Sequence, residues 1–100
     1  MTIHKAPIDY ITIPAPQHSE DAEYRVVFGY VDWQNGKKPN LSIYVLMVYG
    51  GKPNYRMVAH VLTTSNNENE LSDLDKVMSA MQKLKDRHIH EISKYKLDED

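Results

Sequence analysis

The sequence predicts an α+β fold in which an antiparallel three- to four-stranded β-meander precedes one long C-terminal amphipathic helix. Two observations carry this prediction. Between residues 24 and 64, three stretches rich in Val, Ile, Tyr and Thr are joined by short connections, which favour antiparallel neighbours because parallel ones need a long crossover. From about residue 68, apolar residues recur at helical spacing with no Gly or Pro before residue 96. The helix is expected to pack on one face of the sheet.

Size and composition support a single globular domain over residues 1–100. The chain has 100 residues, of which 41% are hydrophobic and 26% charged, as is usual for a soluble domain. The formal net charge is −2, which disfavours a generic basic nucleic-acid binder. The absence of cysteine excludes disulfides, thiolate metal sites and a cysteine nucleophile.

The N-terminal residues 1–22 are expected to form a loose segment. Residues 1–9 are polar and contain Pro7, and residues 14–22 have the composition of a loop. A short β-branched and aromatic stretch at residues 10–13 is stopped by Pro14 and Pro16. Because proline cannot donate to a sheet, this stretch is predicted at an edge of the sheet or outside it.

Three strands are predicted next, at residues 24–33, 41–49 and 55–64. All three are rich in the β-branched and aromatic residues that fit a pleated surface. Asn35-Gly36 is the turn signal in the first connection, and residues 50–54 form the second.

One helix is predicted over residues 68–95. Either Asn67 with Glu70 or Ser72 with Asp75 could cap its start. At 100° per residue its apolar residues share one side, and the expected buried positions are Leu74, Val77, Met78, Met81 and Leu84. Residues 96–100 are charged and are expected to form a frayed acidic tail.

The predicted sheet has two apolar faces, whereas one helix can cover only one of them. Alternation along the second and third strands places seven residues on the face away from the helix, and this is the predicted partner-binding set: Tyr44, Leu46, Val48, Arg56, Val58, His60 and Leu62. Their cover could come from the N-terminal segment, from a second copy in a homodimer, or from a foreign protein. Large exposed apolar patches usually mark contact sites.

No group of residues predicts catalysis, a cofactor or a metal. His88 and His90 point to opposite sides of a helix, and His88 with Glu91 supplies too few ligands for a structural zinc site. His88 is therefore expected to be partly buried, packing through its ring, and His90 to be solvated. His60, Arg56 and Tyr44 lack a nucleophile or carboxylate pair, and Gly50-Gly51-Lys52 lacks the phosphate-loop pattern.

The leading functional hypothesis is a small non-catalytic protein-binding module with an unidentified protein partner and a homodimeric state. By size and style alone it could be an inhibitor or adaptor encoded by a phage or mobile element, as anti-CRISPR proteins are. The alternative is a single-stranded nucleic-acid-binding protein that uses aromatic and basic residues of the sheet: Tyr30, Trp33, Tyr44, Arg25, Lys37, Lys38 and Arg56. Without a signal segment or a membrane-spanning stretch, the expected location is the cytoplasm, with no membrane partner.

Overall fold

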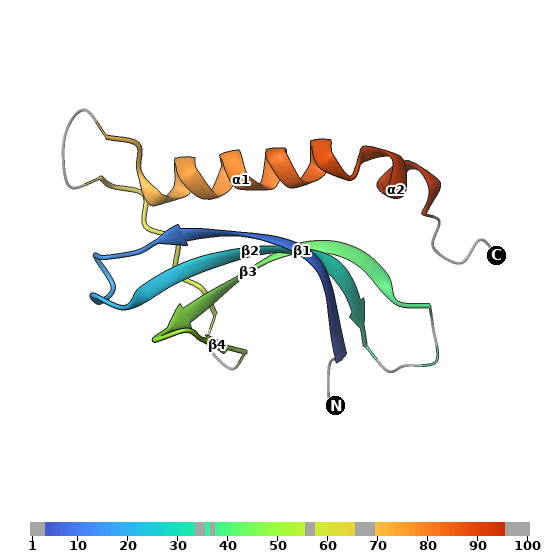
Figure 1. Ribbon diagram of the computed structural model, residues 1–100, viewed down its shortest axis with the longest axis horizontal. Coiled ribbons are helices and arrows are strands. Elements are labelled where there is room, and N and C mark those ends of the chain that lie inside the picture. The colour runs from blue at the N-terminus through green and yellow to red at the C-terminus, as the bar shows by residue number, and fades with distance from the viewer. Residues whose placement is uncertain (1–3, 34–35, 37, 56–57, 66–69, 96–100) are drawn as a thin grey trace.

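Four strands in chain order form one antiparallel sheet, and two consecutive helices follow it (Figure 1). The computed structural model describes residues 4–33, 36, 38–55, 58–65 and 70–95. The elements are β1 (His4–Pro14), β2 (Ala22–Asp32), β3 (Asn40–Tyr49), β4 (Lys52–Asn54), α1 (Asp73–Arg87) and α2 (Ile89–Lys94). The sheet order is β1-β2-β3-β4. The predicted fold class, an antiparallel meander followed by a C-terminal helical segment on one face, is confirmed.

The N-terminal segment is not loose over residues 4–14 as predicted, because this half of it forms the edge strand β1. Each of its residues except Ile8 has a register partner on β2, from His4 opposite Asp32 to Pro14 opposite Glu23. A bulge between Pro7 and Asp9 accommodates the proline. Gly29 lies opposite Pro7, and a Cβ at Gly29 would come within 2.5 Å of the Ala6 carbonyl oxygen, so only glycine allows this close pairing.

The strands predicted at residues 24–33 and 41–49 correspond to β2 and β3, but the strand predicted at residues 55–64 is wrong. Residues 58–64 have no regular secondary structure, and residues 56 and 57 lie outside the described part of the chain. The hairpin closes earlier than predicted because Gly50 and Gly51 both have positive φ, 56° and 81°, as a two-residue type I′ turn requires. β4 therefore begins at Lys52 and ends at Asn54.

The helix begins at the second of the two predicted caps. The Ser72 hydroxyl accepts from the Asp75 N–H, and an Asp75 carboxylate oxygen accepts from the Ser72 N–H, which completes a capping box. The predicted single helix over residues 68–95 is wrong in one respect, because it is interrupted at His88. The backbone of His88 leaves helical geometry there, with φ −114° and ψ 25°.

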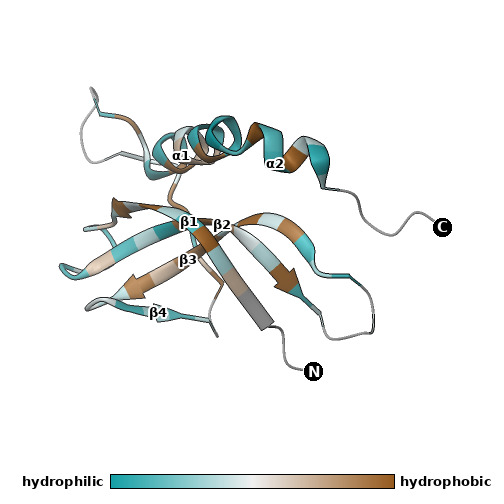
Figure 2. Ribbon diagram, turned by 45° about the vertical axis from the view of Figure 1, so that its right-hand side comes forward, coloured by the Kyte–Doolittle hydropathy of each residue, from teal (hydrophilic) through white to brown (hydrophobic). Residues whose placement is uncertain are grey.

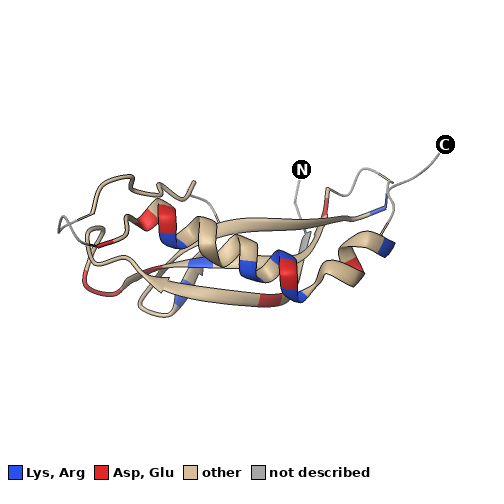
Figure 3. Ribbon diagram, turned by 90° about the horizontal axis from the view of Figure 1, so that it is seen from above, with Lys and Arg blue, Asp and Glu red and all other residues tan. Residues whose placement is uncertain are grey.

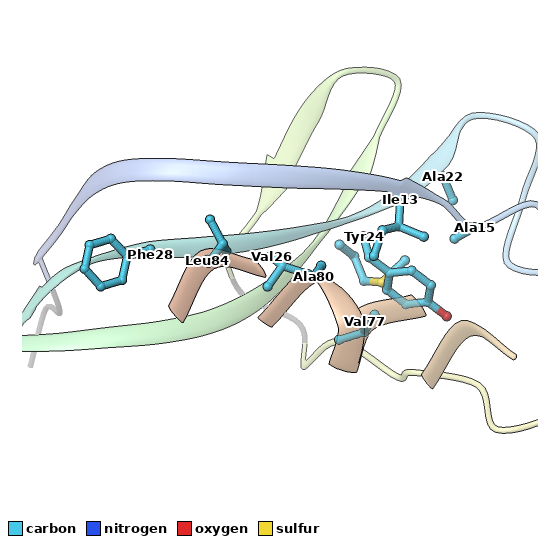
Figure 4. Close-up of a cluster of buried hydrophobic side chains, with 10 residues drawn as sticks. Ile13, Ala15, Ala22, Tyr24, Val26, Phe28, Val77, Ala80 and Leu84 are labelled. Carbon is cyan, nitrogen blue, oxygen red and sulfur yellow. The ribbon is translucent and has the colours of Figure 1, made fainter. Parts of the chain in front are cut away.

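The core lies between α1 and the sheet face formed by alternate residues of β1, β2 and β3 (Figure 4). The fully buried side chains at its centre include Tyr24 and Val26 of β2, Met47 of β3 and Leu84 of α1. The side of α1 that points away from the sheet is hydrophilic (Figure 2) and carries both signs of charge (Figure 3).

The helix face is rotated slightly from the predicted one. Val77 and Leu84 are buried as expected, but Leu74 and Met81 are half-buried, and Met78 is 57% exposed. Asp73 and Ala80 take the central positions instead. The buried stripe follows Asp73, Val77, Ala80 and Leu84, so Met78 falls on a flank that the sheet does not cover.

The predicted acidic tail at residues 96–100 lies outside the described residues. Among the helices that the structure describes, none has the length and hydropathy to cross a membrane.

Substituting Leu84 by Ala should lower the free energy of unfolding by about 2–4 kcal/mol, because the side chain is completely buried under the sheet. The matched control is Met78→Ala on the same helix, which should cost less than about 1 kcal/mol since Met78 is exposed. Urea unfolding followed by circular dichroism measures both. Equal losses in the two variants would contradict the packing described above.

Candidate functional site

A buried hydrogen bond joins β2 of the sheet to the start of α1. The hydroxyl of Tyr24 on β2 donates to the Asp73 carboxylate at a distance of 2.6 Å. Both residues are buried, and Asp73 is the first residue of α1, where the positive end of the helix dipole favours a carboxylate. Burial and the bond to Asp73 raise the pKa of Tyr24 to about 12, so Tyr24 remains a neutral donor.

The same hydroxyl organises the segment predicted to be a strand. Tyr24 accepts a hydrogen bond from the backbone N–H of Leu62 at 3.3 Å. The ring of His18 lies edge-on to Tyr24, and its Nε2 lies 2.9 Å from the His60 carbonyl oxygen, to which it donates. The Leu62 carbonyl in turn accepts from the N–H of Leu74. Side chains and a helix end thus satisfy backbone groups that a sheet ladder would otherwise bind.

This polar cluster is structural, because its central pair, Tyr24 and Asp73, is shielded from solvent. The sequence did not predict this cluster, because hydrophobic periodicity places Tyr24 in a strand and Asp73 in a helix but does not show that the two side chains meet. One available signal was the position of Asp73 directly after the Ser72 cap, at the start of the apolar stripe.

Substituting Tyr24 by Phe should destabilise the protein by about 1–3 kcal/mol, because the Asp73 carboxylate would stay buried without its donor. Tyr10→Phe, at a half-exposed position on β1, is the control and should change stability by less than about 0.5 kcal/mol. Denaturant unfolding measures both variants. An unchanged midpoint for Tyr24→Phe would show that the hydroxyl is not buried against Asp73.

A second polar cluster lies at the other end of α1, where His88 separates the two helices. Its ring stacks on Phe28 of β2, with centroids 4.4 Å apart and planes 12° from parallel. Nε2 lies 2.9 Å from an Asp9 carboxylate oxygen, and Nδ1 lies 3.0 Å from a Glu91 carboxylate oxygen. Arg87 also reaches Asp9, at 3.3 Å. His88 is therefore partly buried and packs through its ring, as predicted, and His90 is exposed.

The two carboxylates favour the doubly protonated ring of His88. Each carboxylate oxygen accepts, so both ring nitrogens must donate to satisfy them. The bonds to Glu91 and then Asp9 raise the pKa of His88, whereas the bond from His88 lowers the pKa of Asp9. Within the described residues, no group of three or more His, Cys, Asp or Glu side chains has the arrangement of a metal site.

Stability should depend on pH through His88. A raised pKa adds stability below the unfolded value of 6.5, and this is lost as the pH rises through the folded pKa. The lowered pKa of Asp9 adds stability above its unfolded value of 3.8, which is lost on acidification. The pair therefore stabilises most between these two values.

His88→Gln should lower the melting temperature by a few degrees near pH 5.5 and by less near pH 8.5. The control His90→Gln, an exposed histidine on the same helical segment, should show no such difference. Thermal unfolding at the two pH values measures the effect. A pH-independent difference between wild type and His88→Gln would contradict the protonated pairing.

The structure divides the predicted partner-binding set between two places. Tyr44, Leu46 and Val48 do share the sheet face directed away from α1, but Leu46 and Val48 are already buried. Val48 lies between Glu23 of β2 and Pro53 of β4, and Leu46 lies opposite Arg25. The expectation of a wholly uncovered face is therefore wrong for these two residues.

The remaining predicted residues do not join them on a strand. Val58, which is 77% exposed, His60 and Leu62 belong to the irregular segment that crosses the end of the sheet towards α1. Arg56 lies outside the described residues. The N-terminal segment pairs beside β2 and does not fold over the face.

The face away from α1 is concave, because the sheet bends away from the helix (Figure 1). We call it the concave face and define it by residues of β1, β2 and β3 that alternate onto it: Tyr10, Thr12, Glu23, Arg25, Val27, Tyr44, Leu46 and Val48. Tyr10, Val27 and Tyr44 form one row across the three strands, and Thr12, Arg25 and Leu46 form the next.

Aromatic rings and one guanidinium dominate the accessible part of the concave face. Arg25 lies over the ring of Tyr10, with its guanidinium carbon 4.6 Å from the ring centroid, and Tyr10 is 50% exposed. Burial, together with the nearby Tyr55, raises the pKa of Tyr44. Arg25 Nε is buried and has no hydrogen-bond partner among the described residues.

Tyr49, Lys52, Pro53, Asn54 and Tyr55 line a shallow hollow of about 450 Å³ beside β4. It adjoins the β4 edge of the concave face, because Pro53 lies opposite Val48.

Searches of protein-family models, curated proteins and solved structures find no match for this chain.

Proposed function

We propose that this chain is a small non-catalytic protein-binding module, acting as an inhibitor or adaptor, and that the concave face is its binding surface. The observation that carries the proposal is the Arg25–Tyr10 stack on this face. Tyr and Arg are enriched among the residues that dominate binding energy at protein interfaces. A ring that is already stacked loses little freedom on binding, which favours affinity.

The chemistry of the face indicates the chemistry of the partner. Arg25 places a guanidinium over the exposed Tyr10 ring, and a guanidinium is a favoured partner for a carboxylate or carbonyl oxygen. Tyr10 and Tyr55 offer exposed ring surface. The partner surface should therefore combine an apolar or aromatic side chain with an acidic one.

The arrangement of positive charge favours a protein over a single-stranded nucleic acid. Lys38 lies over the ring of Tyr95, 4.3 Å from its centroid, and Tyr95 packs against Tyr30 on the helix side of the sheet. Neither Lys38 nor Tyr30 thus contributes to the concave face. Lys37 and Arg56 lie outside the described residues, and the net charge is −2.

Affinity purification from source cells should recover one stoichiometric protein with wild type and lose it with Tyr10→Ala. A central aromatic contact contributes about 2 kcal/mol, or roughly a 30-fold increase in Kd for the purified pair. Arg25→Lys keeps the charge but not the planar stack, so it should weaken binding as well. The control Lys83→Ala, on the exposed side of α1, should bind as wild type does.

Fluorescence anisotropy with a labelled oligothymidylate at low and moderate salt tests the nucleic-acid alternative. The proposal expects no binding. Salt-dependent binding that Tyr10→Ala weakens would instead assign the concave face to single-stranded nucleic acid. Equal recovery of a protein partner by wild type and Tyr10→Ala would also refute the proposal.

A further inference from the structure

The two edges of the sheet differ in how they resist pairing with another chain. The outer edge of β1 carries Pro7, Pro14 and a bulge, all of which obstruct a further strand. β3 has none of these devices, since residues 40–49 contain no proline, glycine or charged residue. β4 pairs only with residues 47–49, so no strand of the described chain lies beside residues 40–46.

The backbone of β3 presents hydrogen-bonding groups at this edge. The N–H of Gly50 donates to the Asp21 carbonyl, which continues the β2–β3 ladder beyond Tyr49. In an antiparallel ladder, the backbone N–H and C=O groups of alternate residues are directed to the same neighbouring strand. Because Gly50 bonds to the β2 side, the backbone groups of the even-numbered residues of β3 bond to β2. Leu41, Ile43 and Val45 therefore direct their N–H and C=O groups outwards.

The helix leaves the same edge partly uncovered. α1 packs against β1 and β2, and its β1 flank carries Lys76, Ser79 and Lys83. The opposite flank carries Met78 and Met81, of which Met78 is largely exposed. Ile92 of α2 lies beside Leu41 at a hollow of about 250 Å³.

We propose that the occupant of this edge is a second copy of this chain, paired antiparallel through β3 about a two-fold axis at Ile43. Ile43 of one copy then lies opposite Ile43 of the other, Leu41 opposite Val45, and Ser42 opposite Tyr44. The aliphatic side chains of the paired residues, Leu41, Ile43 and Val45, lie on the helix side in both copies, so the pairing is self-complementary, as a two-fold interface requires.

The absence of charge on β3 favours a second copy. A two-fold axis pairs the strand with an identical strand, so a charge near the axis would lie close to the same charge of the other copy. Because β3 has no charged residue, this repulsion is absent. A stable interface needs about 800 Å² per partner, more than five paired residues bury. Met81 and Ile92, which pack against the same core cluster as Leu41, Ile43 and Val45, border the seam on the helix side, and their apolar surface adds to the area buried. The resulting eight-stranded sheet joins two concave faces into one.

A charge-swap experiment tests the axis position. Ile43→Lys and Ile43→Glu should each be monomeric, because like charges would lie directly opposite across the axis. Their equimolar mixture should restore the dimer through a Lys–Glu pair. Sedimentation equilibrium over about a hundred-fold concentration range measures the states, and circular dichroism confirms that each variant is folded. The lysine stem can lie on the apolar edge with its amine in water.

A proline pair tests the backbone direction. Ile43→Pro removes an outward N–H and should yield a folded monomer, whereas Tyr44→Pro removes an N–H bonded to β2 and should unfold the chain. A wild type that stays monomeric at every concentration would overturn the proposal and leave the edge to a foreign strand. So would a wild-type dimer that Tyr10→Ala dissociates and Ile43→Lys does not, because this would place the contact on the concave face. Failure of the mixture to associate, with a dimeric wild type, would overturn the Ile43 axis.

Discussion

The hydrogen bond between Tyr24 and Asp73 is the constraint on which the rest of the structure depends. It fixes the start of α1 over β2, and the same hydroxyl holds the segment that leads from the sheet to the helix. A buried carboxylate is costly without a donor, so the helix cannot shift along the sheet without exposing Asp73 or leaving it unpaired. The register between the two layers is therefore set by a polar contact within an apolar core.

The cluster around His88 holds the other end of α1. The helix has 15 residues between the two clusters, about 22 Å at the usual rise per residue. Asp73 bonds to the central strand β2 at one end, and His88 bonds to the edge strand β1 at the other. Two contacts on different strands fix the angle of the helix as well as its position. The concave face lies on the opposite side of the sheet and takes no part in positioning the helix.

The sequence predicts elements well where one physical signal dominates. β2, β3 and the Ser72–Asp75 capping box follow from β-branched composition and from a short-range motif. Residues 58–64 carry the same composition as a strand, but Tyr24 bonds to the Leu62 N–H and His18 bonds to the His60 carbonyl. Hydrophobic periodicity does not reveal a side chain 38 residues away. For the candidate site, alternation places Tyr44, Leu46 and Val48 on one face correctly. The fold buries two of them, Leu46 and Val48, and the pairing of β1 with β2 adds Tyr10, whose stretch the sequence places at an edge of the sheet or outside it.

The order of the strands has a consequence for the folding pathway. Every strand pairs with its neighbour in sequence, so the sheet can grow by successive hairpins, each of which closes a short loop. The contacts that dock the helix span 49 residues between Tyr24 and Asp73 and 79 between Asp9 and His88. Closing such loops costs more chain entropy than closing a hairpin. We therefore expect the meander to form as a local unit, and docking of the helix to be the late, long-range step that completes the native state.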